Sequence, residues 1–582
     1  MKPLHIGDNA LGKRIELTAK DRAAHMHVIG SSGSGKSKFL EWMIRGDITN
    51  RQGFCLIDPH GTLYKEVLEY CAHWVLDREI VLLDLSKPSH IIGFNPFRKT
   101  ASGDISVQVD RRIAATMHAW GVANTDDTPT LERMLRLIFT MLVEQDLPFQ
   151  HAQYLIDFGS HQIREGLIAG LSSPLIRREW QELQQLRAKD WRGETLSVKN
   201  RLFRLLTSQT LLRFFSSSTE ALDIPEIIED GKILLVNLGW SDEFSGENAR
   251  IFGALLVNEF FEVARRRAAK PGRALEPYYL YIDEFQTFIS LDVTKKMLDE
   301  VRKFGLLTVL AHQRFGQLDR DLADAVLTNC RIKAVFGGLP FESAKMMAQE
   351  LFIGELDPMK IKVAIYQTKF WPKYGRDRVY TSSTSTGRST GQGDNEALAS
   401  SSGAASGQFF SAADWFSPPE ITGASLSLSN AGSTVSGRHT SSTEFDGEVE
   451  GVADVPIMIP VPFQELSSVQ YFSTEEQLTQ LTAALKEQFE RHCFIKIHKQ
   501  KTQPMLVPTV QSFFTPRENI QWYEQRLHAR SNARPAAEVD AAIQKEDSAF
   551  TASFENTPAP GQAPKVSSKR PPAAWEDLLG RE

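Results

Sequence analysis

The stretch "HVIGSSGSGKSKFL" (residues 27–40) decides the fold of this chain. Its middle fits the pattern G-x-x-x-x-G-K-[ST] at every position. An apolar run, "HMHVIG", comes before the pattern, and "SKFLEWMIRGDI" follows it with apolar residues at helical spacing. A strand, a glycine-rich turn and a helix in this order are typical of a loop that binds nucleotide phosphates. A plain flexible Gly/Ser turn is the alternative.

A phosphate loop of this kind brings three types of group to a nucleotide. Backbone N–H groups and the dipole of the following helix face the anionic oxygens. Lys36 offers a positive charge to the β and γ phosphates, and Ser37 offers its hydroxyl to Mg²⁺. We therefore predict that ATP and Mg²⁺ bind to eight consecutive residues, namely Gly30, Ser31, Ser32, Gly33, Ser34, Gly35, Lys36 and Ser37.

The composition limits the class of protein. Of the 582 residues, 42% are hydrophobic and 24% are charged, which is typical of a globular protein with several domains. The formal net charge is −6, so nucleic acid would have to bind to a local basic patch. The four cysteines are scattered without a C-x-x-C pair, which argues against a zinc site and for a reducing compartment.

No targeting or membrane segment is visible in the sequence. The N-terminal stretch "MKPLHIGDNALGKRIEL" has no apolar centre of a signal peptide, and no run of about 18 apolar residues occurs. We therefore expect a cytoplasmic protein without a transmembrane segment, which reaches the inner membrane only as a peripheral protein, through a partner.

Strands that alternate with helices predict a mainly parallel sheet. Between 99 and 195 the strand signals disappear, and helical patterns such as "LERMLRLIFTMLVEQ" take their place. We therefore expect the fold class α/β, a P-loop NTPase (RecA-like) with an inserted all-α domain. The expected strands are "GFCLIDPHG" (53–61), "IVLLDLS" (80–86), "GKILLVNLG" (231–239), "YYLYIDEF" (278–285), "LLTVLAHQ" (306–313) and "IKAVFGG" (332–338).

The C-terminal third changes in composition. A Ser/Thr/Gly-rich stretch has too few large apolar residues to bury a core, so we expect it to be disordered. Ser473 and Glu476 then form a possible capping box at the start of a helix. The predicted segments are 1–98 (an N-terminal β element and the first part of the ATPase domain), 99–195 (all-α insertion), 196–372 (second part of the ATPase domain), 373–451 (low-complexity linker), 452–530 (a small α/β segment) and 531–582 (a disordered tail).

The strand in "LYIDEF" ends in two acids. Asp283 is expected to hold Mg²⁺, and Glu284 is expected to orient or deprotonate the attacking water. An apolar strand that ends in Asp-Glu is a weak signal alone, but it becomes strong when a complete phosphate loop is present.

Three further polar residues lie at strand ends or junctions. Gln313 ends a strand, where it is either a sensor of the γ-phosphate or a core glutamine with satisfied hydrogen bonds. Arg302 heads a helix-to-strand junction, where it either stabilises phosphoryl charge or is an exposed helix-end residue. Asp58 either contacts the site indirectly or shapes its own turn.

The motifs, taken in order, resemble one family. They are "HVIGSSGSGKS", "FCLIDPHG", "YLYIDEFQ", "EVRKFGLLTVLAHQ" and "LTNCRIKAVFGGLPFESAKMMAQEL". Together they resemble the type IV secretion system coupling proteins, the TraG/TraD type of conjugative DNA-transfer ATPase in the HerA/FtsK superfamily. The resemblance covers roughly 1–372.

The resemblance implies roles for two residues by matched position. Arg302 would be an arginine finger that acts in the site of a neighbouring subunit, and Gln313 would be a catalytic sensor. It also implies a homohexamer that moves DNA, single- or double-stranded. The expected partners are a relaxase or relaxosome and inner-membrane components of the type IV secretion system.

Other functions stay open at this point. Most coupling proteins begin with a transmembrane pair, whereas this sequence begins almost directly with the ATPase domain, so a HerA-like DNA-processing or phage-defence translocase is an alternative. A secretion ATPase with a protein substrate is another. The basic stretch 177–206 contains Trp180 and Trp191 and is either a DNA-binding surface or an ordinary amphipathic helix pair.

Overall fold

A computed structural model describes the chain as two compact units, residues 1–357 with 473–582 and residues 358–472, and each unit is described here by itself. The described residues are 2–99, 104–122, 128–216, 222–241, 244–268, 275–288, 298, 300–387, 396–403, 429–436 and 445–555, and side chains are not described within 377–456 or at 555.

The first unit is built on a sheet that has eleven strands among the described residues. The seven strands from β10 to β5 are parallel, and the four at the other end are antiparallel. The expected mainly parallel sheet is therefore confirmed. In spatial order the strands are β2 (Arg14–Leu17), β1 (Leu4–Asp8), β16 (Gln503–Leu506), β15 (His492–Ile497), β10 (Cys330–Phe336), β3 (His25–Ile29), β9 (Leu306–His312), β8 (Tyr278–Ile282), β4 (Phe54–Asp58), β7 (Ile233–Asn237) and β5 (Ile80–Asp84).

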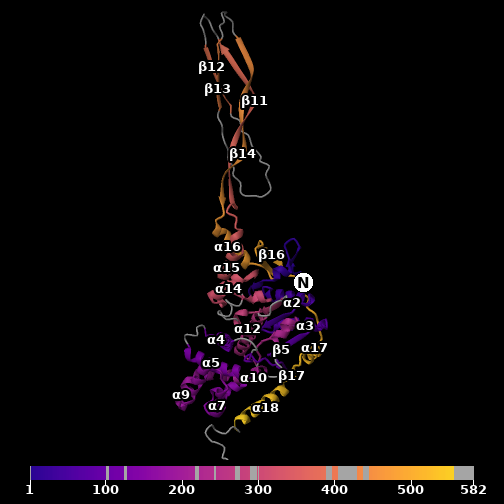
Figure 1. Cartoon of the computed structure of the whole chain (residues 1–582). Coiled ribbons are helices and arrows are strands. Elements are labelled where there is room, and N and C mark those ends of the chain that lie inside the picture. Colours follow the sequence, from indigo (N-terminus) through magenta and orange to yellow (C-terminus); the bar gives the residue numbers. More distant parts are fainter. Residues whose placement is uncertain are drawn as a thin grey trace, which may run out of the picture. The chain divides into compact units, whose positions relative to one another are not determined.

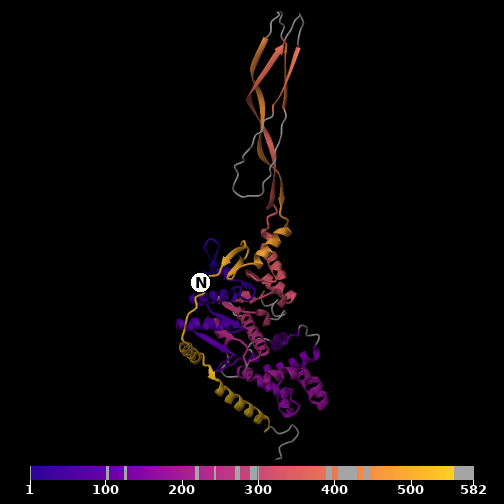
Figure 2. The same ribbon diagram turned by 180° about the vertical axis from the view of Figure 1, so that it is seen from behind.

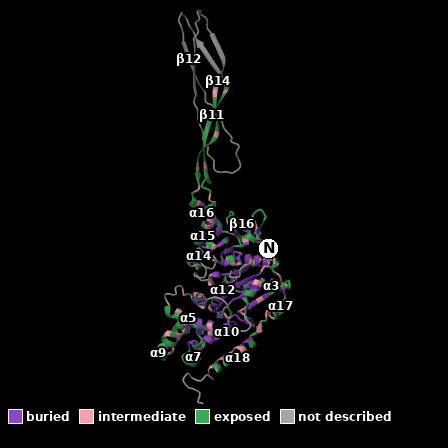
Figure 3. Ribbon diagram, viewed as in Figure 1, coloured by how far each residue is buried: buried purple, intermediate pink, exposed green. Residues whose placement is uncertain are grey.

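Helices cover both faces of this sheet (Figures 1 and 2). Successive strand residues point to opposite faces, so Phe54 and Leu56 join one apolar core while Cys55 and Ile57 join the other. The first core is completed by α2 (Lys36–Thr49), α3 (Thr62–His73) and α17 (Arg517–Arg530). The second is completed by α12 (Gly246–Ala268) and the helical insertion. The buried residues form a continuous interior between these layers (Figure 3).

The all-α insertion is present and is longer than the expected 99–195. Its helix α9 runs through the expected boundary, because Trp191, Val198, Leu202 and Leu205 are all buried in one core and hold the helix together. The insertion comprises α4 (Ile105–Ala119), α5 (Pro129–Glu144), α6 (Ala152–Ile156), α7 (His161–Ala169), α8 (Pro174–Gln184), α9 (Ala188–Leu206), α10 (Gln209–Ser216) and α11 (Ile224–Glu229).

The segment after 472 differs from the separate α/β piece that the sequence predicts. Helix α16 (Thr474–Lys486) begins with the expected capping box of Ser473 and Glu476. The strands that follow, β15 and β16, extend the main sheet, because β15 pairs with β10 in five consecutive positions. This segment therefore belongs to the first unit and its main sheet.

Helix α18 (Ala536–Glu555) lies where we expected a disordered tail from 531. It forms because one side is apolar and packs on the insertion: Val539 is buried, and Phe550 stacks on His151 with ring centroids 3.8 Å apart. Arg213 also forms two hydrogen bonds of 2.8 Å with Asp540. Residues 556–582 of the predicted tail lie outside the described residues.

The second unit is an antiparallel ribbon of β11 (Ile361–Gly387) and β14 (Phe445–Tyr471). Both strands enter the range 373–451, where we expected a linker, and β12 (Glu396–Gly403) pairs with β13 (Ser429–Ser436) in the same range. Low hydrophobicity suggested disorder, but Thr381, Thr384 and Thr386 are β-branched residues that favour strands.

A membrane-spanning helix was not expected from the sequence. In the part of the chain that the structure describes, no helix is both long and apolar enough to cross a bilayer.

Candidate nucleotide site

The phosphate loop lies between β3 and α2, as the sequence predicts. Gly33 and Gly35 have φ angles of 78° and 99°, which favour glycine. A Cβ at Gly33 would meet no atom within 4 Å, so the loop leaves open space where backbone groups can face a phosphate. Helix α2 begins at Lys36, and Ser37 is exposed in its first turn. The loop therefore fits a nucleotide.

Three distant segments fix the shape of this loop through backbone hydrogen bonds. Gly30 N donates to His312 O at 3.3 Å, and Ser31 N donates to Gly337 O at 3.2 Å. Arg491 N donates to Ser34 O at 2.9 Å, so the segment after the ribbon supports the loop from the side. A loop held from several strands is preorganised for its ligand.

Lys36 lies against the two acids at the end of β8. Its Nζ is 2.9 Å from Glu284 Oε1 and 3.5 Å from Asp283 Oδ1. The side chains of Lys36 and Glu284 are only 6% and 7% exposed, so the three charges meet in a setting where water screens them little. The structure thus brings together three of the residues selected from the sequence.

The two neighbouring acids differ in their affinity for protons. Burial, together with the adjacent carboxylate of Glu284, raises the pKa of Asp283 even though Lys36 opposes the shift. Burial also acts on Glu284, but Lys36 and hydrogen bonds from Gln286 and Gln313 outweigh it and lower the pKa of this carboxyl group. Glu284 is therefore held in the ionised form.

The backbone also positions Glu284. Its φ and ψ are 46° and 49°, a left-handed conformation that is uncommon for a residue other than glycine. Such local strain is found at functional sites, where the surrounding structure stabilises it. Here the sharp turn after β8 directs the carboxylate back towards Lys36.

Two glutamines hydrogen-bond the Glu284 carboxylate. Gln313 follows β9, and its bond to Glu284 places it inside the cluster, which fits both interpretations from the sequence. Gln286 Nε2 donates to Glu284 Oε2 at 2.7 Å. Sequence reasoning missed Gln286, and the only signal was its position two residues after Glu284.

Asp58 shapes the turn after β4. Its carboxylate accepts hydrogen bonds from His60 N at 2.8 Å and from Tyr64 N at 2.9 Å. The same carboxylate contributes to the raised pKa of Asp283. Both readings of Asp58 from the sequence therefore have support, since it holds a turn and acts on the site through its charge.

A pair of buried histidines lies beside the cluster. His27 Nε2 and His312 Nε2 are 2.8 Å apart, so one nitrogen donates and the other accepts. Burial, followed by the charge of Lys36, lowers the pKa of His312 to about 3, and burial lowers that of His27 as well. Both rings are therefore neutral near pH 7.

Arg302 does not join the cluster in its own chain. It precedes β9, whereas Gln313 follows β9, and a seven-residue strand at about 3.3 Å per residue separates the two by roughly 20 Å. Arg302 Nε donates to Ala23 O at 2.6 Å, just before β3. A cavity of about 690 Å³ lies at this amino end of the sheet, and Arg302 and Lys303 are among its lining residues.

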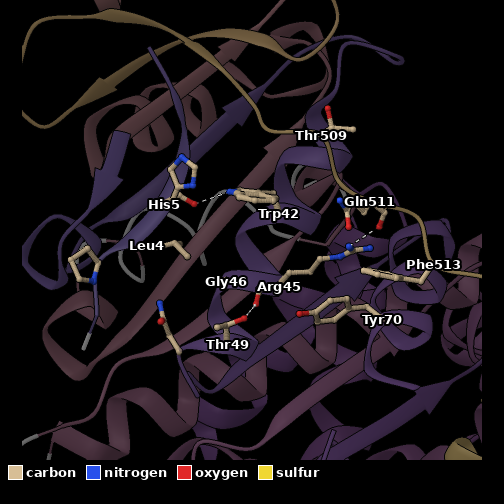
Figure 4. A pocket seen from close by; sticks show the side chains of 12 residues that line it. Leu4, His5, Trp42, Arg45, Gly46, Thr49, Tyr70, Thr509, Gln511 and Phe513 are labelled. Carbon is tan, nitrogen blue, oxygen red and sulfur yellow. Dashed lines mark hydrogen bonds between the residues drawn. The ribbon is translucent and has the colours of Figure 1, made fainter. Parts of the chain in front are cut away.

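A second cavity, of about 530 Å³, lies between the β1 edge and helices α2 and α3 (Figure 4). Arg45 points into it, donates to Gln511 O at 2.8 Å, and covers the ring of Tyr70 at 4.6 Å. Trp42 Nε1 donates to His5 O at 2.8 Å. None of the predicted site residues lines this cavity, and its contacts attach the segment before α17 to α2 and α3.

One sequence family matches part of the chain. Its description is "TraM recognition site of TraD and TraG", and it matches residues 277–360. In this segment the chain is similar to TraD and TraG. The segment contains β8, β9 and β10, and with them Asp283, Glu284, Arg302 and Gln313, whereas the phosphate loop lies before it. No curated protein sequence matches the chain.

Several solved structures are similar in fold at low sequence identity. The bacterial conjugative coupling protein TrwB, in a form named TrwBdeltaN70, is 13% identical with a TM-score of 0.45, and the alignment covers 89% of this chain and 91% of that chain. TrwB in complex with ADP and Mg²⁺ is also 13% identical, with a TM-score of 0.46 and coverages of 88% and 92%. VirB4 of Thermoanaerobacter pseudethanolicus is 11% identical, with a TM-score of 0.40 and coverages of 60% and 87%.

Proposed function

We propose that this chain is an ATPase that works as a homohexamer and moves DNA in conjugative transfer through a type IV secretion system. The observation that carries the proposal is the split of catalytic groups across one sheet. Lys36, Asp283 and Glu284 meet at the carboxyl ends of the strands, while Arg302 lies at the amino ends. The match of residues 277–360 to TraD and TraG supports conjugation as the setting.

In this proposal each residue has one task. Lys36 gives up its ion pairs with the two acids and binds the β and γ phosphates instead. Ser37 and Asp283 would hold Mg²⁺, which neutralises phosphate charge when bound. Glu284 orients or deprotonates the attacking water, because its lowered pKa keeps it ionised. Gln313 links this carboxylate to the end of β9 and would sense the γ-phosphate.

Arg302 would complete the site of a neighbouring subunit. A planar guanidinium suits the charge that develops on a transferred phosphoryl group. Its position at the opposite end of β9 supports action between subunits, since the same side chain is too far from its own Lys36.

The partners follow from the same setting. We propose a relaxase or relaxosome as the source of the DNA, and inner-membrane components of the secretion system as the docking site. The family that matches residues 277–360 is described as a TraM recognition site, so a partner of the TraM type would contact this segment.

The proposal is tested by measuring ATP hydrolysis by the purified chain with no DNA, with single-stranded DNA and with double-stranded DNA. We expect DNA to raise the rate, and we expect Glu284→Gln protein to remain inactive under all three conditions. ATP-driven displacement of streptavidin from biotinylated DNA would then report movement. A hydrolysis rate that neither form of DNA changes contradicts a DNA motor and leaves a protein-substrate ATPase as the better description.

A further inference from the structure

The part of the β11–β14 ribbon with described side chains carries a charge opposite to that of the whole chain. In its residues with described side chains, 358–376 and 457–472, there is one acidic residue, Glu465, against a formal net charge of −6 for the full sequence. The same residues include five basic side chains, all exposed and all on or beside β11, namely Lys360, Lys362, Lys369, Lys373 and Arg376.

The ribbon also exposes aromatic rings to an unusual extent. Trp371, Tyr374 and Phe370 are 65%, 77% and 60% exposed. Large aromatic residues of a folded unit normally bury most of their surface. A two-stranded ribbon is itself marginally stable without a partner. These rings therefore mark the ribbon as a binding surface, with Trp371 on one face and Phe370 and Tyr374 on the other.

Strand geometry arranges charges and rings together on one face. Lys369, Trp371 and Lys373 alternate along β11, so all three side chains point to the same face. Phe463 of β14 pairs with Lys369 in the register, and its ring centroid is 5.3 Å from that of Trp371. The result is an aromatic pair with a lysine on each side, and Lys369 also forms an ion pair with Glu465 of β14.

The charge pattern decides between possible occupants. A second copy of this basic part, aligned with the first, would bring like charges together, which disfavours that form of self-association. A polyanion suits the excess of basic residues. Unpaired bases also suit the exposed rings, since every base can stack on an aromatic side chain, whereas the bases of a duplex are already stacked.

The stretch 177–206, which the sequence offered as a DNA-binding surface, lacks this combination. Trp180 and Trp191 are 0% and 2% exposed, because both lie in the core of the insertion. Their rings are not available to bases. The two regions therefore differ in what their tryptophans can contact.

We propose that the β11–β14 ribbon binds single-stranded nucleic acid, with bases stacked on Trp371 and Phe463 and phosphates bound by Lys369 and Lys373. The inference deepens the proposed function and rests on it for the choice of DNA as the natural ligand. The surface itself is argued from the ribbon alone.

The test uses the full chain without ATP and a fluorescein-labelled oligo(dT), with binding followed by fluorescence anisotropy. Trp371→Ala is expected to weaken binding about 5- to 150-fold, the range for loss of one stacked base. Trp74→Ala is the matched control, since Trp74 is 56% exposed but directly follows α3 in the other unit. This control should bind as the unchanged chain does.

A salt titration tests the lysines separately. Each phosphate contact with a single strand adds about 0.7 to the slope of log affinity against log salt, so Lys369→Gln/Lys373→Gln should reduce the slope by about 1.4. The control Lys345→Gln/Lys499→Gln removes two exposed lysines outside the ribbon and should leave the slope unchanged.

Three results would overturn the inference. The first is equal affinity of Trp371→Ala and Trp74→Ala proteins for oligo(dT). The second is a loss of affinity in Trp371→Ala protein for duplex DNA alone. The third is a change in sedimentation of the ribbon variants without a change in DNA binding. The outcome is separate from that of the proposed function. Binding that depends on the ribbon, without DNA-stimulated hydrolysis, would contradict the proposed DNA motor and support the ribbon site. DNA-stimulated hydrolysis that the ribbon variants do not alter would support the motor and contradict the ribbon site.

Discussion

The two ends of one parallel sheet differ in how their charged residues are held. At the carboxyl ends of β8 and β9, Lys36, Asp283 and Glu284 are buried and bonded to one another. At the amino end of β9, Arg302 is partly exposed and its guanidinium makes one hydrogen bond, to Ala23 O, within the part of the chain that is described.

This difference indicates what each end can do alone. Charged side chains that are buried and paired with one another are preorganised, so the carboxyl end of the sheet can bind a nucleotide within one chain. A partly exposed arginine remains available to a second molecule, and burial together with the charge of Arg331 lowers its pKa, so a nearby anion would relieve that repulsion. In our proposal one end therefore holds the nucleotide site, and the other offers a group to the site of a neighbouring subunit.

The largest effect is expected at the carboxyl end. Lys36→Ala removes the charge that binds phosphate and leaves Asp283 and Glu284 without their cation. Nucleotide affinity should fall by at least about 10- to 150-fold, the range for a lost charged hydrogen bond, and hydrolysis should become undetectable. Calorimetric titration with a non-hydrolysable ATP analogue measures the first effect. Unchanged affinity would mean that Lys36 does not touch the phosphates.

Glu284→Gln should separate binding from turnover. The substitution removes the carboxylate that holds Lys36 at 2.9 Å in the absence of nucleotide, so the lysine becomes more available to phosphate. ATP affinity should stay the same or rise, while kcat falls by about 10²–10⁴, as for loss of a general base. Titration and steady-state kinetics on the same preparation check both. A fall in affinity as large as that of Lys36→Ala would contradict the assigned roles.

A smaller effect is expected from pH at the amino end. Burial lowers the pKa of His25 to about 4, whereas an unfolded histidine has a pKa of about 6.5. Below pH 6.5 the His25 side chain takes up a proton in the unfolded chain but not in the folded one, so this residue alone lowers the free energy of unfolding by about 2 kcal/mol at pH 5.

Urea unfolding at pH 7, 6 and 5 measures this dependence. His25→Gln should show a shallower loss of stability with falling pH than the unchanged chain, whatever its stability at pH 7. His60→Gln, which changes an exposed histidine, should keep the original slope. Equal slopes in all three proteins would show that His25 is not held neutral by burial.

Local patterns in the sequence were enough to predict the parallel sheet, and they selected most of the residues of the candidate site. The phosphate loop and the pair Asp283–Glu284 each lie in a short stretch whose spacing carries the information. Gln286 and the support of the loop by Arg491 were missed, because each depends on a turn or a contact between segments far apart in the chain.

Composition alone did not predict helix α18 or the pairing of β15 with the main sheet in the C-terminal third, for the same reason. Helix α18 has few large apolar residues, but Val539 and Phe550 pack on the surface of the insertion. Strand β15 is short, and its pairing with β10 joins residues more than 150 positions apart. Long-range contacts of this kind leave no periodic signal in the local sequence.

The central claim is that one active site is shared between two subunits. Arg302→Ala protein should bind ATP normally and hydrolyse it poorly, since fingers supplied by a neighbour contribute about 10³–10⁵ in rate. Lys36→Ala protein has an intact Arg302 but no nucleotide. In a mixed ring, some interfaces pair an intact Lys36 with an intact Arg302.

The most direct measurement is therefore the ATPase rate of mixtures of the two variants, after subunit exchange and in the presence of DNA. Each variant is also mixed with unchanged protein, because a steeper fall than dilution predicts would reveal a ring that requires every interface to be intact. The account predicts a maximum at an intermediate ratio of the two variants. A flat line, with exchange confirmed and dilution behaviour linear, would contradict it.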